Sequence, residues 1–348
     1  MKYSEEFIAE NLFKKLRKFF EDKSKLIGVE KEGAGVHWNC DVILNCRRSK
    51  IHCFLHRYYD DIRPEYLISF EESDKNKAWG RTFDIQEVIQ STSDWVENKD
   101  IHFLYKKYEF VDWYKRTIQK IEGQLIENES DLLSTEKVLN SPWGSELYDY
   151  QITYRDRSCE LSGYGKREPV SFVFKWDGCK LFEVNQNDLT LLAEVIKKWL
   201  IDEIQPSTLE NQYDWIEVGD LAIHYEKGEG IKGEFIESWN SIERFYGEFS
   251  DEFHPFKADA LKLIQEMRSA ELDEVLRAGQ SLFFLILSRL RRHGLEENHP
   301  YLHITFLGKN KMKVISRLNG KKEIFEAEVK YDGLIKHKIS ELLKEKIQ

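Results

Sequence analysis

The side chains best suited to chemistry lie between positions 37 and 56: His37, Cys40, Asp41, Cys46, His52, Cys53 and His56. Thiolates and imidazoles are the usual ligands of zinc. Even-numbered positions from 36 to 46 are apolar and odd-numbered ones mostly polar, which is typical of a half-buried strand. Strand side chains alternate between two faces, so Cys40, Cys46 and Cys53 fall on the apolar face. Because this separates thiols from imidazoles, and no C-x-x-C spacing is present, we expect no metal site.

The polar face of the same strands holds the candidate catalytic groups. If the chain turns at Arg48-Ser49, Asp41 faces His56, and Asn45 faces His52. An aspartate beside a histidine fixes one tautomer of the imidazole and raises its pKa, as general-base and metal sites require. The alternative is an ordinary polar cross-strand pair, which contributes roughly 0.2–1 kcal/mol. No nucleophile accompanies these groups, so Asp41, His52 and His56 are candidates only, and no catalytic residue is assigned.

A glycine-rich segment, Gly228 to Gly233, matches the pattern G-x-G-x-x-G. It follows a predicted strand over 218–225 and precedes a predicted helix, as a phosphate-binding loop would. The dinucleotide motif, however, belongs to a parallel βαβ unit, whereas this segment lies between antiparallel elements. Glu229 would also direct a negative charge at a phosphate. A flexible loop is the favoured interpretation, and we expect no cofactor.

A basic cluster, Arg289, Arg291 and Arg292, is predicted to end a helix over 273–293. Cations in a last helical turn, followed by a glycine such as Gly294, complement the helix dipole and form a C-cap. The functional alternative is contact with a phosphate or an acidic partner. These three arginines are therefore the candidate partner-binding residues.

The elements that would position these groups recur along the chain. Asp84 precedes Trp95 by eleven residues, and Asp188 precedes Trp199 by the same spacing, each within a predicted helix that follows alternating strands. Three alternating strands near 301–331 and a final helix over 333–347 form a third set. A first helix over 5–22 has Ser4 as its N-cap. The sequence therefore predicts an α+β fold of internally repeated modules, each an antiparallel sheet of about three strands followed by a covering helix.

Three domains follow from this periodicity: residues 1–128, residues 129–252 with an insertion near 205–233, and residues 253–348. The polar run Glu127 to Asp131 marks the first boundary. The chain opens without a basic segment followed by an apolar run, so we expect no secretory signal. Its longest apolar stretch is too short to span a membrane. Five cysteines in no dense framework favour reduced thiols in a cytoplasmic protein.

The net charge of −10 argues against binding to nucleic acid through the phosphate backbone. No Walker loop, H-E-x-x-H, G-x-S-x-G or kinase motif is present. These absences favour a non-enzymatic binding or accessory protein of a bacterial conflict system, either an antiviral defence component or a toxin-neutralising protein. Its partner would be another protein, and a protein encoded in the same operon is a candidate. The alternative is a divergent metal-dependent hydrolase, or another enzyme acting on nucleic acid, centred on Asp41, His52 and His56.

Overall fold

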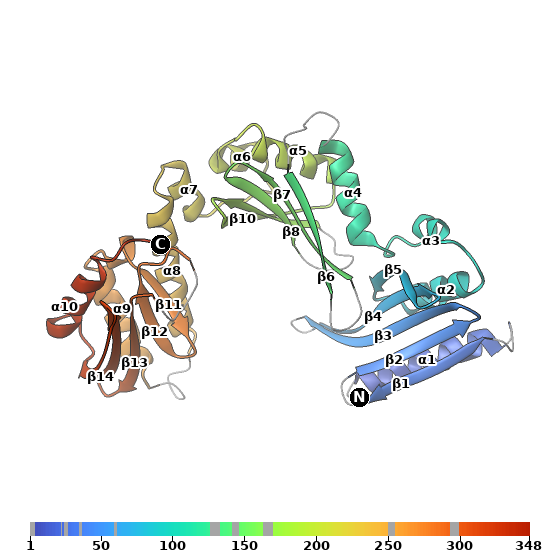
Figure 1. Ribbon diagram of the computed structural model, residues 1–348, viewed down its shortest axis with the longest axis horizontal. Helices are drawn as coiled ribbons and strands as arrows, with labels where there is room; N and C mark the ends of the chain where they lie inside the picture. Colours follow the sequence, from blue (N-terminus) through green and yellow to red (C-terminus); the bar gives the residue numbers. More distant parts are fainter. Residues whose placement is uncertain are drawn as a thin grey trace. The chain divides into compact units, whose positions relative to one another are not determined.

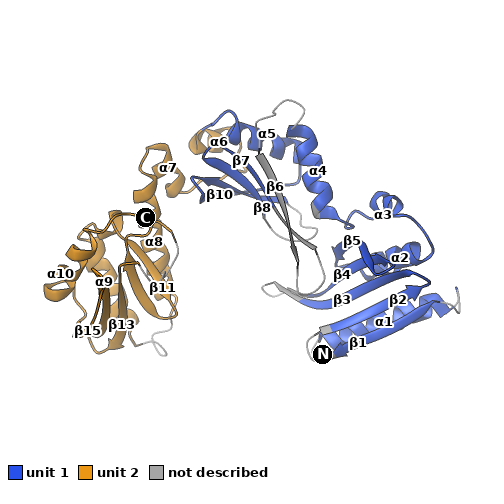
Figure 2. Cartoon of the chain, viewed as in Figure 1, with its two compact units in different colours: residues 1–204 blue, residues 205–348 orange. Residues whose placement is uncertain are grey.

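The computed structural model describes residues 4–21, 23, 27–34, 37–58, 61–125, 133–140, 146–162, 170–249, 255–292 and 299–348. The chain divides into two compact units, residues 1–204 and 205–348 (Figure 2). The α+β class is confirmed, since helices accompany three antiparallel sheets (Figure 1). Each sheet contains more strands than predicted. The predicted domain limits near 128 and 252, with the polar run 127–131, lie outside the described residues.

The first sheet is a meander in the order β1-β2-β3-β4-β5. One helix precedes it in the chain, and three helices follow it. Its elements are α1 Glu5–Glu21, β1 Gly28–Ala34, β2 His37–Leu44, β3 Arg47–Tyr58, β4 Asp61–Glu72, β5 Lys75–Thr82, α2 Ile85–Val96, α3 Ile101–Lys107 and α4 Trp113–Leu125. The first helix begins where predicted, because the Ser4 hydroxyl accepts from the Phe7 amide. Helices α1 and α2 cover one face of this sheet and share its apolar core.

The second sheet has the order β10-β9-β8-β7-β6. Its elements are β6 Leu133–Asn140, β7 Glu146–Tyr154, β8 Arg157–Ser162, β9 Val170–Trp176, β10 Cys179–Gln186 and α5 Leu189–Leu200. Helix α5 packs on β8 and β10. The side chains of Asp84 and Asp188 accept hydrogen bonds from the first-turn amides of α2 and α5, so both aspartates are N-caps. Trp95 and Trp199 are both buried.

The third sheet, in the order β11-β12-β13-β14-β15, lies in the second unit. The elements of this unit are α6 Pro206–Gln212, α7 Asp220–Glu226, α8 Gly230–Gly247, α9 Lys257–Arg268, the 3-10 helix η1 Leu272–Glu274, β11 Arg277–Ser281, β12 Phe284–Ser288, β13 Tyr301–Gly308, β14 Lys311–Leu318, β15 Lys321–Glu328 and α10 Gly333–Leu342. Helices α8, α9 and α10 share one apolar core with the sheet. The sheet is again followed by a helix, α10, but that helix contains no tryptophan.

Two predicted elements are wrong. The helix expected over 273–293 is instead η1 followed by the hairpin of β11 and β12, which turns at Leu282 in a left-handed conformation. The apolar run from Leu282 to Leu287 suits a buried strand as well as a buried helix, and the pattern alone does not separate them. The strand expected over 218–225 is mostly the helix α7. Residues 205–233 contain two short helices and the start of α8.

An arginine joins each sheet to the end of a helix. Arg47, the first residue of β3, donates to the carbonyl of Trp95 in the last turn of α2 and to that of Lys99, which follows the helix. Arg157, the first residue of β8, donates to the carbonyls of Trp199 and Ile204. Arg289, which follows β12, donates to the carbonyl of Glu345 after α10. Helix C-termini leave carbonyls without intrahelical partners, so cations at these positions stabilise the packing of helix on sheet.

Candidate functional site

The outer face of the first sheet, opposite α1 and α2, brings two of the three catalytic candidates onto the same surface. The register pairs Asp41 with Lys50 and Asn39 with His52. The expected pairing of Asp41 with His56 is therefore wrong, and so is that of Asn45 with His52. The chain turns at Asn45-Cys46, where Asn45 is left-handed, three residues earlier than predicted. The side chains of His37 and His56 lie outside the described residues.

Asp41 has a cationic partner in place of the expected histidine. Its carboxylate accepts a hydrogen bond from the Arg48 guanidinium, and Asp41 is only 1% exposed. Burial works to lower the pKa of Arg48, but the hydrogen bond and charge of Asp41 outweigh it, so the pKa of Arg48 is raised. A buried carboxylate paired with a permanent cation is a poor general base or metal ligand, because breaking the pair would leave an uncompensated charge.

Several buried polar atoms on this face lack a hydrogen-bond partner within the described residues. They are Asn39 Oδ1, Asp41 Oδ1, Arg48 Nε and Arg81 Nε. Most buried polar groups in proteins are hydrogen-bonded, so a cluster of such atoms on one face is unusual. Nearby, Glu65 is buried and lies 3.4 Å from Arg81. The arrangement is a polar layer in which the carboxylates of Asp41 and Glu65 lie beside the guanidinium groups of Arg48 and Arg81.

The cysteines are distributed as predicted, with one exception. Cys40 and Cys53 are buried on the core face of the first sheet. A hydrogen bond with Cys40, then burial, raises the pKa of the Cys53 thiol, and burial raises that of Cys159. Cys46 lies in the turn and is exposed, contrary to the prediction that it faces the core. Among the described residues, no three His, Cys, Asp or Glu side chains gather as a metal site would require.

The Gly228–Gly233 segment follows the helix α7 and contains the first turn of α8, so it does not follow a strand as a dinucleotide loop would. Gly228 has φ +74, a conformation that favours glycine. A Cβ at Gly233 would lie 2.5 Å from the His224 Cβ, so the glycine permits α7 and α8 to pack closely. The motif therefore has a packing explanation. A cavity of about 170 Å³ beside it is lined by residues of both helices, including His224, Lys227 and Glu237.

The basic cluster follows β12 and does not end a helix. Arg289 donates to the carbonyls of Val275 and Glu345. Arg291 lies 2.8 Å, and Arg292 3.6 Å, from the Oε1 atom of the buried Glu234 on α8. The Tyr225 hydroxyl donates to the same oxygen. These predicted partner-binding cations thus have intramolecular roles, which the helical interpretation of residues 273–293 could not anticipate.

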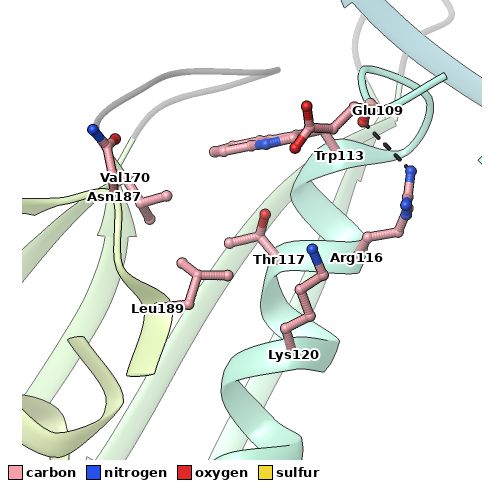
Figure 3. A pocket seen from close by; sticks show the side chains of 8 residues that line it. All are labelled: Glu109, Trp113, Arg116, Thr117, Lys120, Val170, Asn187 and Leu189. Carbon is pink, nitrogen blue, oxygen red and sulfur yellow. Dashed lines mark hydrogen bonds between the residues drawn. The ribbon is translucent and has the colours of Figure 1, made fainter. Parts of the chain in front are cut away.

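A second cavity, of about 140 Å³, lies where α4 meets the beginnings of β9 and α5 (Figure 3). Trp113, Thr117 and Lys120 line it from α4, with Val170, Asn187 and Leu189 opposite. Arg116 turns toward the backbone carbonyl of Glu109, at 3.5 Å. Cofactor pockets usually measure about 300–1,000 Å³. This cavity is too small for such a ligand, and neither cavity includes Asp41 or His52.

Comparisons with known proteins give no further guide to the site. The chain matches no protein-family model, no curated protein and no solved structure. Within the described residues, none of the helices has both the length and the apolar character needed to cross a membrane.

Proposed function

We propose that this chain is a non-enzymatic binding protein whose sheets form a scaffold for contacts with another protein. The state of Asp41 carries this proposal. Its carboxylate is buried and paired with Arg48, and the nearest histidine by register, His52, lies opposite Asn39. The acid–base pair on which the hydrolase alternative depends is therefore replaced by an ion pair.

We further propose that the first two sheets, with α2 and α5, are copies of one module. The shared N-cap aspartates, buried tryptophans and arginines at the helix ends support this interpretation. The third sheet also has an arginine at a helix end, but its indole comes from the preceding helix, where Trp239 Nε1 donates to the Leu276 carbonyl. A repeated scaffold favours binding, because it offers several similar sheet faces in one chain.

The narrower role that we propose lies in a bacterial conflict system, either neutralising a toxin or acting in antiviral defence. The net charge of −10 supports a basic partner as one candidate, because opposite net charges accelerate association. The partner would be a protein, and a neighbouring gene in the same operon is the first candidate to test.

Two measurements test the proposed function. The tagged full chain, expressed from its native locus, should retain one protein at near-stoichiometric amount, and the purified pair should bind with a measurable Kd. His52→Ala should leave that Kd within about threefold, because His52 is a half-buried residue on a sheet surface. Lys180→Ala, an exposed change on the second sheet, is the matched control.

The second measurement addresses catalysis. Wild-type protein and His52→Ala are incubated with single- and double-stranded DNA and RNA in the presence of Mg²⁺, Mn²⁺ or Zn²⁺. We expect no hydrolysis that depends on His52. Metal-dependent hydrolysis that His52→Ala abolishes in a folded protein, together with the absence of any stoichiometric partner, would overturn the proposal in favour of the hydrolase.

A further inference from the structure

The strand β15 lies at one edge of the third sheet and pairs only with β14 among the described strands. Its eight residues keep an unbroken register with β14, whereas the ladders of two other edge strands, β5 and β10, contain register shifts. An edge strand presents unpaired N–H and C=O groups along its outer side, on which a further strand can pair. Within the part of the second unit that the structure describes, β15 therefore offers a regular, unpaired edge.

Most devices that protect an edge strand are missing from β15. Proteins discourage pairing at an edge with bulges, prolines, short strands or a covering element. β15 contains no proline, no glycine and no bulge, and six of its eight residues are exposed. The opposite edge strand, β11, has only five residues and packs against α8. What remains on β15 is charge, since five of its residues are lysines or glutamates.

The charges of β15 are sorted along the strand. Lys321 and Lys322 stand at its beginning, and Glu326 and Glu328 stand near its end. A second copy of the strand that runs antiparallel places the lysine end of each copy beside the glutamate end of the other. A parallel copy in register would place like charges opposite each other, which is destabilising. The charges that discourage an arbitrary strand therefore suit a reversed copy of β15 itself.

The antiparallel ladder restricts how two copies can pair. Alternate residues of β15 direct their N–H and C=O groups toward β14 and away from it, and alternate side chains lie on the two faces of the sheet. Directly opposite residues in a self-pair must therefore both be even-numbered or both odd-numbered. Phe325 and Ala327 pack against the core, so the even-numbered residues of β15 lie on the outer face.

The outer face of β15 has one apolar side chain, Ile324, which is 55% exposed. A twofold axis at this residue places Ile324 opposite its copy, and Lys322 opposite Glu326 of the second copy, twice by symmetry. Branched apolar pairs and opposite charges both stabilise antiparallel strands. Ile324 also lies opposite Ile315 of β14, so four isoleucines would form one row across the two sheets. An axis at Phe325 is less favourable, because it places Ile324 opposite Glu326.

The charged groups that this register brings together are available for pairing. Glu326 lies opposite Lys313 in the ladder, but neither Lys322 nor Glu326 forms an ion pair within the described residues. Glu323 does form one, with Lys338 of α10 at 2.9 Å, and it lies on the core face, away from the new charge pairs. Lys322 and Glu326 can thus pair across the axis without breaking an existing ion pair.

We propose that β15 pairs antiparallel with β15 of a second copy of this chain, about a twofold axis at Ile324. The two third sheets, of five strands each, then form one continuous sheet. Closed twofold pairs are the commonest homo-oligomers. A single strand pair buries less than the roughly 1,200–2,000 Å² of stable complexes, so the dimer should be reversible and dependent on protein concentration. Self-pairing does not depend on the proposed function, because it requires no other protein.

The first test uses the full chain and two charge variants, Lys322→Glu and Glu326→Lys. Each variant places like charges opposite each other twice in its own dimer, so each should weaken dimerisation at least about tenfold. An equimolar mixture of the two variants restores opposite charges at both positions, and the mixed dimer should form about as well as the wild-type dimer. Sedimentation velocity over a wide range of protein concentration measures the dissociation constants, and circular dichroism checks that each variant is folded.

Ile324→Asp is the second test, because it places two carboxylates at the axis and should also weaken the dimer at least about tenfold. Leu282→Asp, an exposed change in the turn between β11 and β12 at the other edge of the same sheet, should leave the dimer unchanged. A wild-type chain that stays monomeric, or charge variants whose mixture does not restore dimerisation, would overturn the proposal. So would a monomeric chain that loses a native partner on Ile324→Asp, since the edge would then belong to that partner. A native partner that binds the monomeric variants normally leaves the proposed function standing.

Discussion

The first and second sheets hold their helices by closely similar contacts. Trp95 Nε1 donates to the carbonyl of Arg48, and Trp199 Nε1 donates to that of Ser158, the residue after the arginine in each case. The guanidinium of Arg47 lies 4.4 Å from the Trp95 ring, and that of Arg157 lies 4.2 Å from the Trp199 ring. A phenylalanine meets each indole edge-on with centroids 6.0 Å apart, Phe70 in the first sheet and Phe174 in the second.

The two sheets differ at the residue opposite the arginine. Arg47 is paired with Glu72, which lies 2.9 Å from it, whereas Arg157 is paired with Trp176 and lies between two indoles. One sheet thus uses an ion pair where the other uses a second aromatic ring. The bonds from each guanidinium to two helix-end carbonyls are common to both. This difference indicates that the carbonyl bonds define the arrangement and that the third partner is interchangeable.

The largest effect should come from the tryptophans. Trp95→Ala and Trp199→Ala should each lower the free energy of unfolding of their own sheet by about 3–5 kcal/mol, because a buried indole is removed. Hydrogen exchange measured by mass spectrometry reports each region separately, which is necessary in a chain of two compact units. If only one of the two variants lost protection from hydrogen exchange in its own sheet, the two tryptophans would not have equivalent roles.

Arginine-to-lysine changes test the shared carbonyl bonds while they preserve the charge. Lysine lacks the planar fork that reaches two carbonyls and lies over an indole. Arg157→Lys and Arg47→Lys should each cost about 1–3 kcal/mol in the free energy of unfolding. Arg157→Lys should cost more, because Arg157 is 3% exposed and the Arg47 side chain is 14% exposed. Equal hydrogen-exchange rates in Arg47→Lys and wild type would show that the carbonyl bonds contribute nothing.

Exchanging the variable partner sharpens the comparison. If the position opposite the arginine accepts either chemistry, Trp176→Glu should destabilise the second sheet less than Trp176→Ala does, by about 0.5–1 kcal/mol. The new carboxylate would face Arg157 as Glu72 faces Arg47. Urea unfolding followed by circular dichroism gives the order of the two variants. A Trp176→Glu protein that is less stable than Trp176→Ala would show that the two positions are not equivalent.

The matching positions on the helices α2 and α5 could be predicted from the sequence, but the matching arginines on the strands β3 and β8 could not. Asp84 and Asp188 stand eleven residues before their tryptophans, and a continuous helix preserves that spacing. Arg47 precedes Glu72 by 25 residues, whereas Arg157 precedes Trp176 by 19, because the hairpin of β3 and β4 is longer. Hairpins differ in length without disturbing the register at their base, so equivalent residues lose a common spacing.

The sequence predicted the sheet face on which Asp41 lies, but not the residue with which its carboxylate pairs. The alternation of Cys40 and Asp41 between core and outer face is confirmed. The partner of Asp41 depends on the position of the turn, which lies at Asn45-Cys46 and not at the predicted Arg48-Ser49. Asparagine tolerates the left-handed conformation that such a turn requires, so Asn45 was the available signal. The third sheet has five strands where three were predicted, because residues of β11 and β12 were predicted as helix.

The only stabilising change among these predictions should come from Thr92. This residue stands three positions before Trp95, where the second sheet's helix has Ile196 before Trp199. Both are buried, but Thr92 Oγ1 has no hydrogen-bond partner within the described residues. Valine has nearly the shape of threonine without the hydroxyl, so Thr92→Val should raise the free energy of unfolding by about 1 kcal/mol.

Thr82 supplies the matched control, because it is also buried but its hydroxyl donates to Glu87 and accepts from the Asp84 amide. Thr82→Val should therefore lower the free energy of unfolding by about 1–2 kcal/mol, since it leaves two partners unpaired. Opposite signs in a thermal melt of the two variants would show that the first sheet carries an uncompensated polar group where the second has an apolar contact. Equal destabilisation by both would mean that the Thr92 hydroxyl is satisfied in solution, and the two helix–sheet interfaces would then differ less than their sequences indicate.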